Sequence, residues 1–175
     1  GEPRRVAQAL SCLAYTLSVL KGASGAAAIG QIFTTVRALL KEQKIDEPYA
    51  QGFVDQMESY TAVNMGQLRR ARDLAERAEQ VFLNRCLGAT WEITNTRFVR
   101  LAMSGLMGEF ATLSEELPRI LRESRERNDR NAINLLGCLH TRPYFLAADD
   151  KEQAERTLAS WGLSDSGKAS LNSAL

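Results

Sequence analysis

The amino-acid sequence predicts an all-α protein, an α-solenoid of stacked antiparallel helical hairpins. Apolar and small residues recur at helical spacing along the chain, and strand-like alternation is absent. The pattern also repeats, because helix breaks at Gly25, Gly66, Gly108 and Asp149 are separated by 41, 42 and 41 positions. A period near forty with a helix break in each unit is typical of helical repeat arrays. We therefore expect about eight helices in four repeats of 41–42 residues.

The first hairpin is predicted at the start of the chain. Pro3 suits the first turn of a helix over 3–20. The predicted core stripe of this helix is Val6, Leu10, Leu13, Ala14, Leu17 and Leu20. A Gly-Ala-Ser-Gly segment then breaks it, and Ser24 can cap a second helix over 25–44. The stripe of the second helix is Ile32, Val36, Leu39 and Leu40.

The second hairpin has the clearest pattern. Asp46-Glu47-Pro48 supplies an N-cap, an acidic first turn and a proline at the start of a helix that ends near Asn64. Its predicted buried residues are Phe53, Met57, Tyr60 and Ala62 or Val63. The fourth helix follows over 66–87, with its stripe at Leu68, Ala71, Leu74, Ala75, Ala78 and Phe82. On its outer face, opposite charges four positions apart are expected to pair, Arg72 with Glu76 and Asp73 with Arg77.

The third hairpin contains a helix that is apolar on two sides. Thr90 is predicted to cap this fifth helix, which buries Trp91 and packs between two neighbours. The sixth helix, over 109–127, carries the stripe Leu113, Leu117 and Ile120. Pro118 lies within it and should bend the helix or shorten it from its start.

The fourth hairpin and the tail complete the predicted domain organisation. The seventh helix is expected to begin at Asp129 and to end near Arg142, where Pro143 follows. The eighth begins at Asp149 or Asp150 and ends at Trp161. We assign residues 1–162 to one helical repeat domain. The Ser-, Gly- and Asn-rich tail 163–175 is expected to be poorly packed or to begin a further repeat.

Composition limits the classes of function. Of 175 residues, 45% are hydrophobic, which is enough for a substantial core. A formal charge of +1 gives no reason to expect nucleic acid or an anionic membrane as a partner. No long apolar run and no signal peptide are evident. Because an initiator Met is lacking, we expect a segment of a longer chain. Cys12, Cys86 and Cys138 are widely spaced and are expected to be buried, reduced thiols, which indicates a cytoplasmic protein.

No pattern of catalytic or metal-binding residues emerges. His140 has no partner at a metal-ligand spacing, so neither a metal nor a cofactor is expected. The glycines between 22 and 30 lack the Lys and Ser/Thr of a phosphate-binding loop and follow no strand. The alternating charges over 122–130 suit a solvated helix end better than an anion site. We predict that the chain is not an enzyme.

Polar strips on the odd-numbered helices are the candidate binding residues. The strip of the fifth helix has Glu92, Asn95, Thr96 and Arg100, and that of the seventh has Asn131, Asn134 and Cys138. The third helix carries Gln51, Asp55 and Glu58. If the odd-numbered helices line one concave surface, these strips converge on one groove; the alternative is ordinary solvated surface. The residues predicted to contact a partner are Glu92, Asn95, Arg100, Asn131 and Asn134.

Two resemblances accompany these patterns. The segment Gly-Gln-Leu-Arg-Arg-Ala-Arg-Asp-Leu-Ala-Glu-Arg-Ala-Glu, 66–79, resembles the second helix of tetratricopeptide-type repeats, although the period here is longer. Several segments also resemble the C-terminal helical region of large bacterial serine/threonine kinases that carry an ATPase-like module. These segments are 1–10, 46–50, 86–92, 117–123 and 146–150. The tail departs from that resemblance because it lacks the aromatic-rich continuation expected there.

The resemblance implies a non-catalytic docking module, the regulatory repeat region of a bacterial signalling kinase. Its partner would be a protein, a peptide or another domain of the parent chain. No Gly-rich loop, His-Arg-Asp or Asp-Phe-Gly occurs, so no catalytic residue is transferred. The alternative is a small-ligand-binding sensor domain of a bacterial regulator. A deep pocket beside Trp91, Asn95 and Asn131 would favour this alternative, whereas an open groove would favour a polypeptide.

Overall fold

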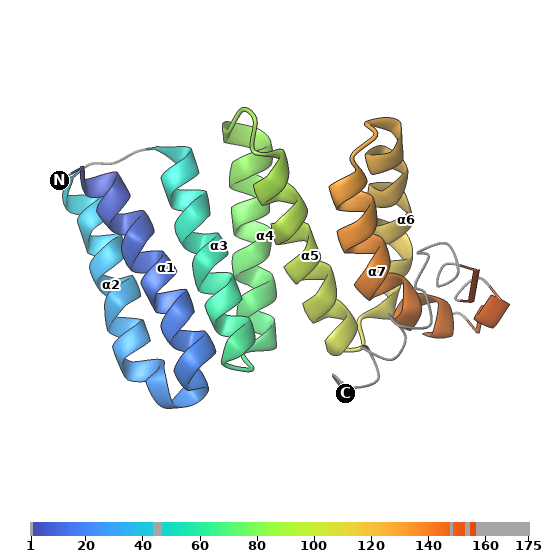
Figure 1. Ribbon diagram of the computed structural model, residues 1–175, viewed down its shortest axis with the longest axis horizontal. Coiled ribbons are helices and arrows are strands. Elements are labelled where there is room, and N and C mark those ends of the chain that lie inside the picture. The colour runs from blue at the N-terminus through green and yellow to red at the C-terminus, as the bar shows by residue number, and fades with distance from the viewer. Residues whose placement is uncertain (1, 44–46, 148, 153–154, 157–175) are drawn as a thin grey trace, which may run out of the picture. The chain divides into compact units, whose positions relative to one another are not determined.

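The predicted all-α class is confirmed. A computed structural model describes residues 2–43, 47–147, 149–152 and 155–156, and these residues contain helices and no strand. The elements are α1 (Pro3–Lys21), the 3-10 helix η1 (Gly22–Gly25), α2 (Ala26–Glu42), α3 (Pro48–Asn64), α4 (Leu68–Arg85), α5 (Thr90–Leu106), α6 (Phe110–Glu126) and α7 (Arg130–Ala147) (Figure 1). Of the predicted eighth helix, residues 151, 152, 155 and 156 are helical. The rest of that helix and the tail 163–175 lie outside the described residues.

Two prolines disturb their helices less than the sequence suggested. α6 begins at Phe110 and continues through Pro118, so it is not shortened from its start. α7 continues to Ala147, whereas the sequence predicted an end near Arg142. A proline inside a helix removes one backbone hydrogen bond, and packing of the remaining turns can keep the helix continuous.

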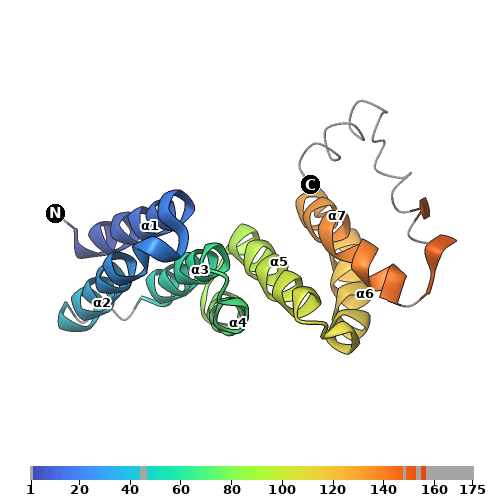
Figure 2. The ribbon, with the colours of Figure 1, turned by 90° about the horizontal axis from the view of Figure 1, so that it is seen from below.

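The chain divides into two compact units, which are described separately. The first, Gly1–Gly108, contains α1 to α5, and the second, Glu109–Leu175, contains α6 and α7. In the first unit consecutive helices run antiparallel (Figure 1). Viewed along the helices, α1, α3 and α5 form one row, with α2 and α4 in a second row (Figure 2). In the second unit α6 packs against α7.

The turns repeat the same backbone conformation. Gly66, Gly108 and Asp149 adopt φ of +71°, +77° and +56°, at three of the four predicted helix breaks. This left-handed region is open to glycine and, at lower cost than to most residues, to aspartate. The first break differs from the prediction, because Gly22 has φ +53° whereas Gly25 has φ −87°.

One pattern of hydrogen bonding recurs at three helix ends. After α3, the Gln67 amide donates to the Ala62 carbonyl at 2.9 Å. The same five-residue closure links Asp129 to Ser124 at 2.8 Å and Asp150 to Phe145 at 2.8 Å. It satisfies carbonyls that the last turn of a helix leaves without an intrahelical partner. Asp129 also caps α7 as predicted, since its Oδ1 accepts from the Ala132 amide at 3.0 Å.

The core of the first unit lies between the two helix rows. α4 buries Ala71, Leu74, Ala75, Ala78 and Phe82, as its stripe predicted. The position of Phe82 favours glycine at position 52, because a Cβ built on Gly52 would lie 2.8 Å from the Phe82 ring. Glycine therefore lets α3 approach the aromatic ring closely. In the second unit Leu113, Leu117 and Ile120 are buried as predicted.

The buried face of α1 matches the predicted stripe only in part, because Ala14 is buried as predicted and Leu10 and Leu17 are partly buried against the core. Its buried residues are small, namely Ala7, Ser11, Ala14 and Ser18. Most of the larger apolar residues face outward: Val6 and Leu13 are nearly half exposed, and Leu20 is 75% exposed. Small side chains allow α2 and α3 to pack closely on α1, whereas a face of leucines would hold them further away.

Two further expectations need correction. Ser24 does not cap α2, because its hydroxyl donates to the Lys21 carbonyl. Cys12 is an exposed thiol, whereas Cys86 is half-buried and burial raises its pKa. Within Pro3–Glu42, an 18-residue stretch has a mean hydropathy of 1.3 and is 22% buried, so this part of the chain could cross a membrane by length and composition alone. Core helices and signal sequences meet the same criterion.

Candidate functional site

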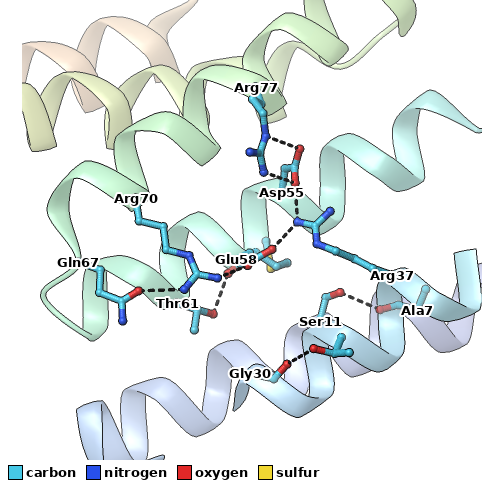
Figure 3. A network of polar contacts seen from close by, with 12 residues as sticks. Ala7, Ser11, Gly30, Arg37, Asp55, Glu58, Thr61, Gln67, Arg70 and Arg77 are labelled. Atoms are coloured by element: carbon cyan, nitrogen blue, oxygen red, sulfur yellow. Dashed lines mark hydrogen bonds and ion pairs between the residues drawn. The ribbon is translucent and has the colours of Figure 1, made fainter. Parts of the chain in front are cut away.

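A groove in the first unit lies over α3, between α2 and α4. We call it the arginine groove, and it has a larger charged part and a smaller apolar hollow. The charged part has a volume of about 400 Å³ and is lined by Arg37, Glu58, Arg70, Asp73, Leu74 and Arg77. The groove is open to solvent. The apolar hollow adjoins the charged part and shares Glu58 and Arg70 with it. Figure 3 shows the side chains of the three helices converging here.

Two buried carboxylates of α3 bind the arginines of the groove, and one of them, Glu58, also lines it. Asp55 and Glu58 are three positions apart on α3, so both side chains lie on one face of the helix. Their side chains are only 12% and 8% exposed. Buried carboxylates require cationic partners and hydrogen bonds to remain ionised.

Three arginines from the neighbouring helices supply those partners. From α2, Arg37 Nη2 donates to Asp55 Oδ1 at 2.7 Å and also to Glu58 Oε2. From α4, Arg70 Nη2 donates to Glu58 Oε1 at 2.6 Å. Arg77 reaches Asp55 through two nitrogens, at 3.2 and 3.4 Å. The carboxylates of α3 thus tie α2 to α4 (Figure 3).

Each arginine side chain in this cluster is about half exposed. Burial opposes the charge on Arg37, but its hydrogen bonds to Asp55 and Glu58 outweigh burial and raise its pKa. Three arginines share two carboxylates, so one positive charge is in excess. Asp73, also at the groove, is paired with Arg72 at 2.9 Å and leaves that excess unchanged.

The adjoining hollow is mostly apolar. Its volume is about 40 Å³, and its lining residues are Ala26, Ile29, Gly30, Phe33, Glu58, Thr61, Ala62, Met65, Gln67 and Arg70. The space beside Gly30 in this hollow is empty, because a Cβ built on Gly30 would meet no atom within 4 Å. An apolar side chain of a ligand could therefore lie beside the charged cluster.

The candidate residues that the sequence placed on α5 are engaged within the protein. Glu92 accepts a hydrogen bond of 2.7 Å from the Tyr49 hydroxyl, and burial together with this bond raises the pKa of Tyr49 to about 12. Asn95 Nδ2 donates to the Trp91 carbonyl at 2.8 Å. Arg100 was expected to face solvent. It is instead buried, with its Nε 2.9 Å from Glu79 Oε2.

The remaining candidate residues lie on the second unit. Asn131 and Asn134 are exposed on α7. They belong to a different compact unit from Glu92, Asn95 and Arg100. Trp91, expected in the core, is 57% exposed. A binding role for the predicted residues stays a prediction. The contacts of Glu92 connect α5 to α3, and those of Arg100 connect α5 to α4.

Sequence reasoning missed the arginines of the groove. The strip of Asp55 and Glu58 was visible as a polar edge on α3, but nothing local identified its partners. Arg77 was expected to pair with Asp73 on its own helix, yet it contacts Asp55 on α3. The one local signal was that Arg70 and Arg77 are seven positions apart, on the same face of α4.

The arrangement suits recognition of an anionic group. Guanidinium forks bind carboxylates and phosphates with directed hydrogen bonds. Among the described residues there is no group of three or more His, Cys, Asp or Glu side chains that could hold a metal ion. In comparisons with protein-family models, curated proteins and solved structures, nothing matches this chain.

Proposed function

We propose that this chain is a non-catalytic interaction module, a tetratricopeptide-like α-solenoid that docks a polypeptide in the arginine groove. The occupant would be a separate protein, a peptide or another domain of the parent chain. The paired rows of antiparallel helices and the recurring left-handed turns support the solenoid assignment. The resemblance to the repeat region of bacterial serine/threonine kinases supports a regulatory role in a signalling kinase of the cytoplasm.

The observation that carries the proposal is the groove over α3. It is open, bordered by α2 and α4, which run parallel to each other, and combines a charged cluster with an apolar hollow (Figure 1). Grooves of this kind receive helices or extended segments, with apolar anchors for affinity and charged contacts for specificity. A reaction would require a nucleophile or acid-base pair positioned at the hollow, and its lining offers arginines that are already ion-paired.

Blocking the groove tests the proposal. Peptides selected from a random phage-displayed library on the intact chain would be titrated against the wild type and Gly30→Phe. A phenylalanine at position 30 would occupy the apolar hollow without altering any arginine. Gly30→Ala is the matched control, because one methyl group leaves the groove open.

We expect Gly30→Phe to lose at least tenfold in peptide affinity and Gly30→Ala to bind like the wild type. If Gly30→Phe retains full affinity, the groove is not the docking site. Circular dichroism of both variants checks that the helices are intact.

A second candidate function is a small-ligand sensor. It is favoured by the volume of about 400 Å³, which falls within the usual range of ligand sites. A metabolite bound there should raise the melting temperature of the wild type but not of Gly30→Phe or Arg70→Gln. Absence of such a shift across a panel of anionic metabolites would leave the polypeptide as the only candidate of the two.

A further inference from the structure

We infer that the polypeptide docked in the arginine groove is acidic, presenting one carboxylate to Arg70 and Arg77 and an adjacent apolar side chain to the hollow beside Gly30. This inference rests on the proposed function and specifies the chemistry of its ligand. Three observations support it: the charge of the groove, the fixed positions of its arginines and the closeness of its charged and apolar parts.

The charge of the groove favours a single carboxylate. Asp55 and Glu58 together neutralise two of the three guanidinium groups above them. One carboxylate from a ligand would neutralise the remaining positive charge. The arginines could bind it, because each partly exposed guanidinium can donate up to five hydrogen bonds. A nucleic-acid backbone would bring many phosphates to a site with one excess positive charge, in a chain of formal charge +1.

The arginines are held in position before any ligand arrives. Arg70 is fixed by Glu58 and also donates to Gln67 Oε1 at 3.2 Å. Arg77 is fixed by two contacts to Asp55. Because the buried carboxylates already restrict these long side chains, a ligand loses less side-chain entropy on binding than it would at mobile surface arginines.

The position of the apolar hollow specifies the residue next to the carboxylate. Arg70 and Glu58 line both parts of the groove, so the charged and apolar contacts of a ligand must be close together. In a helical ligand the two side chains would be three or four positions apart, and in an extended ligand two apart. The small volume of the hollow, about 40 Å³, suits part of one side chain such as Leu, Val or Met.

The experiment uses a defined peptide pair. From the groove-binding peptides selected above, one would be synthesised with its Glu or Asp intact and with that residue changed to Gln or Asn. Affinities would be measured by fluorescence anisotropy for the wild type, Arg70→Gln, Arg77→Gln and Arg69→Gln. Arg69 is the matched control, since it is an exposed arginine beside Arg70 on the same helix.

We expect the neutral peptide to bind the wild type at least tenfold more weakly than the acidic peptide. Arg70→Gln and Arg77→Gln should each weaken the acidic peptide about tenfold or more, while Arg69→Gln changes affinity less than about twofold. The neutral peptide should bind the wild type and the two groove variants alike. Affinity for the acidic peptide should also fall as salt is raised.

Each contrary result has a distinct meaning. If Gly30→Phe abolishes binding but the selected peptides lack acidic residues, or the arginine variants bind normally, the groove docks polypeptides and the acidic assignment is wrong. If Gly30→Phe binds normally, the proposed function itself fails. A phosphoserine peptide that binds tighter than the glutamate peptide would overturn the choice of carboxylate. Circular dichroism and melting curves of the arginine variants separate lost contacts from lost fold.

Discussion

Arg37 on α2 donates a hydrogen bond of 2.7 Å to the buried Asp55 on α3. The same nitrogen also contacts Glu58, so one half-exposed side chain of α2 binds both buried carboxylates of α3. This contact fastens α2 to α3, while apolar contacts hold α2 mainly against α1. A polar cluster therefore contributes to the docking of one helix and shapes the groove beside it.

Arg37→Met is expected to lower the free energy of unfolding by about 1 kcal/mol. The loss is moderate because Asp55 keeps Arg77, Glu58 keeps Arg70, and Arg37 itself is half exposed to screening solvent. Urea unfolding followed by circular dichroism measures it. Arg69→Met is the control and should stay within about 0.5 kcal/mol of the wild type. Equal stability of the two variants would contradict a structural role for the Arg37 contacts.

Arg100→Ala is expected to destabilise the protein by about 3 kcal/mol, although the sequence suggested a solvent-facing residue. Arg97 and Arg100 of α5 both contact Glu79 of α4, and all three side chains are at most 11% exposed. Arg100→Ala removes a buried, charge-assisted hydrogen bond and truncates a buried side chain, although Glu79 keeps its contact with Arg97. Arg119→Ala, which removes an exposed pair with Glu123, should cost less than about 1 kcal/mol. Thermal and urea unfolding of both variants provides the comparison.

Substitutions at Leu13 and Ala14, which the sequence placed in one buried stripe of α1, should differ in their effect on stability. Leu13→Gln should change stability by less than about 1 kcal/mol because Leu13 is nearly half exposed. Ala14→Leu should cost about 1–3 kcal/mol because Ala14 has no exposed surface and a larger side chain would push α1 from its neighbours. Urea unfolding is the measurement. A larger loss for Leu13→Gln than for Ala14→Leu would mean that the helix is rotated relative to this structure.

Trp91→Ala and Phe82→Ala form a second contrasting pair. More than half of Trp91 is exposed, so its removal should cost less than about 1 kcal/mol. Phe82 is fully buried between Tyr49, Gly52 and Ala78, and its truncation should cost about 3–5 kcal/mol. Fluorescence of Trp91 should also be that of a solvent-exposed indole. A costly Trp91→Ala would place this residue in the core, as its sequence pattern suggested.

The hydrogen bond between Tyr49 and Glu92 predicts a loss of stability at alkaline pH. Burial and this bond raise the pKa of Tyr49 from 10.0 to about 12. In the unfolded chain the phenol ionises near its ordinary pKa, whereas in the folded protein it stays neutral. The contribution is therefore fully present below pH 10 and is lost as the pH rises from about 10 to about 12. Stability of Tyr49→Phe should fall less steeply over this interval, which urea unfolding at several pH values would show.

Helical periodicity by itself determined much about this protein. The apolar stripes of α4 and α6 identified residues that are buried, and the spacing of Gly66, Gly108 and Asp149 located recurrent turns. Such features depend on contacts within a few residues, because helix periodicity and the left-handed backbone are local properties. The general helix order followed from the same signals.

Tertiary structure alone decided which face of α1 is buried and where the charged residues meet. A stripe of leucines and a stripe of small residues have the same period, and only close packing against α2 and α3 adds Ala7, Ser11 and Ser18 to the buried face. The exposed position of Trp91 likewise depends on which neighbours α5 has. In the groove, Arg37 is 18 positions from Asp55, and Arg77 is 22 positions beyond it. Ion pairs across such separations form because three helices bring the groups together, which no local pattern encodes.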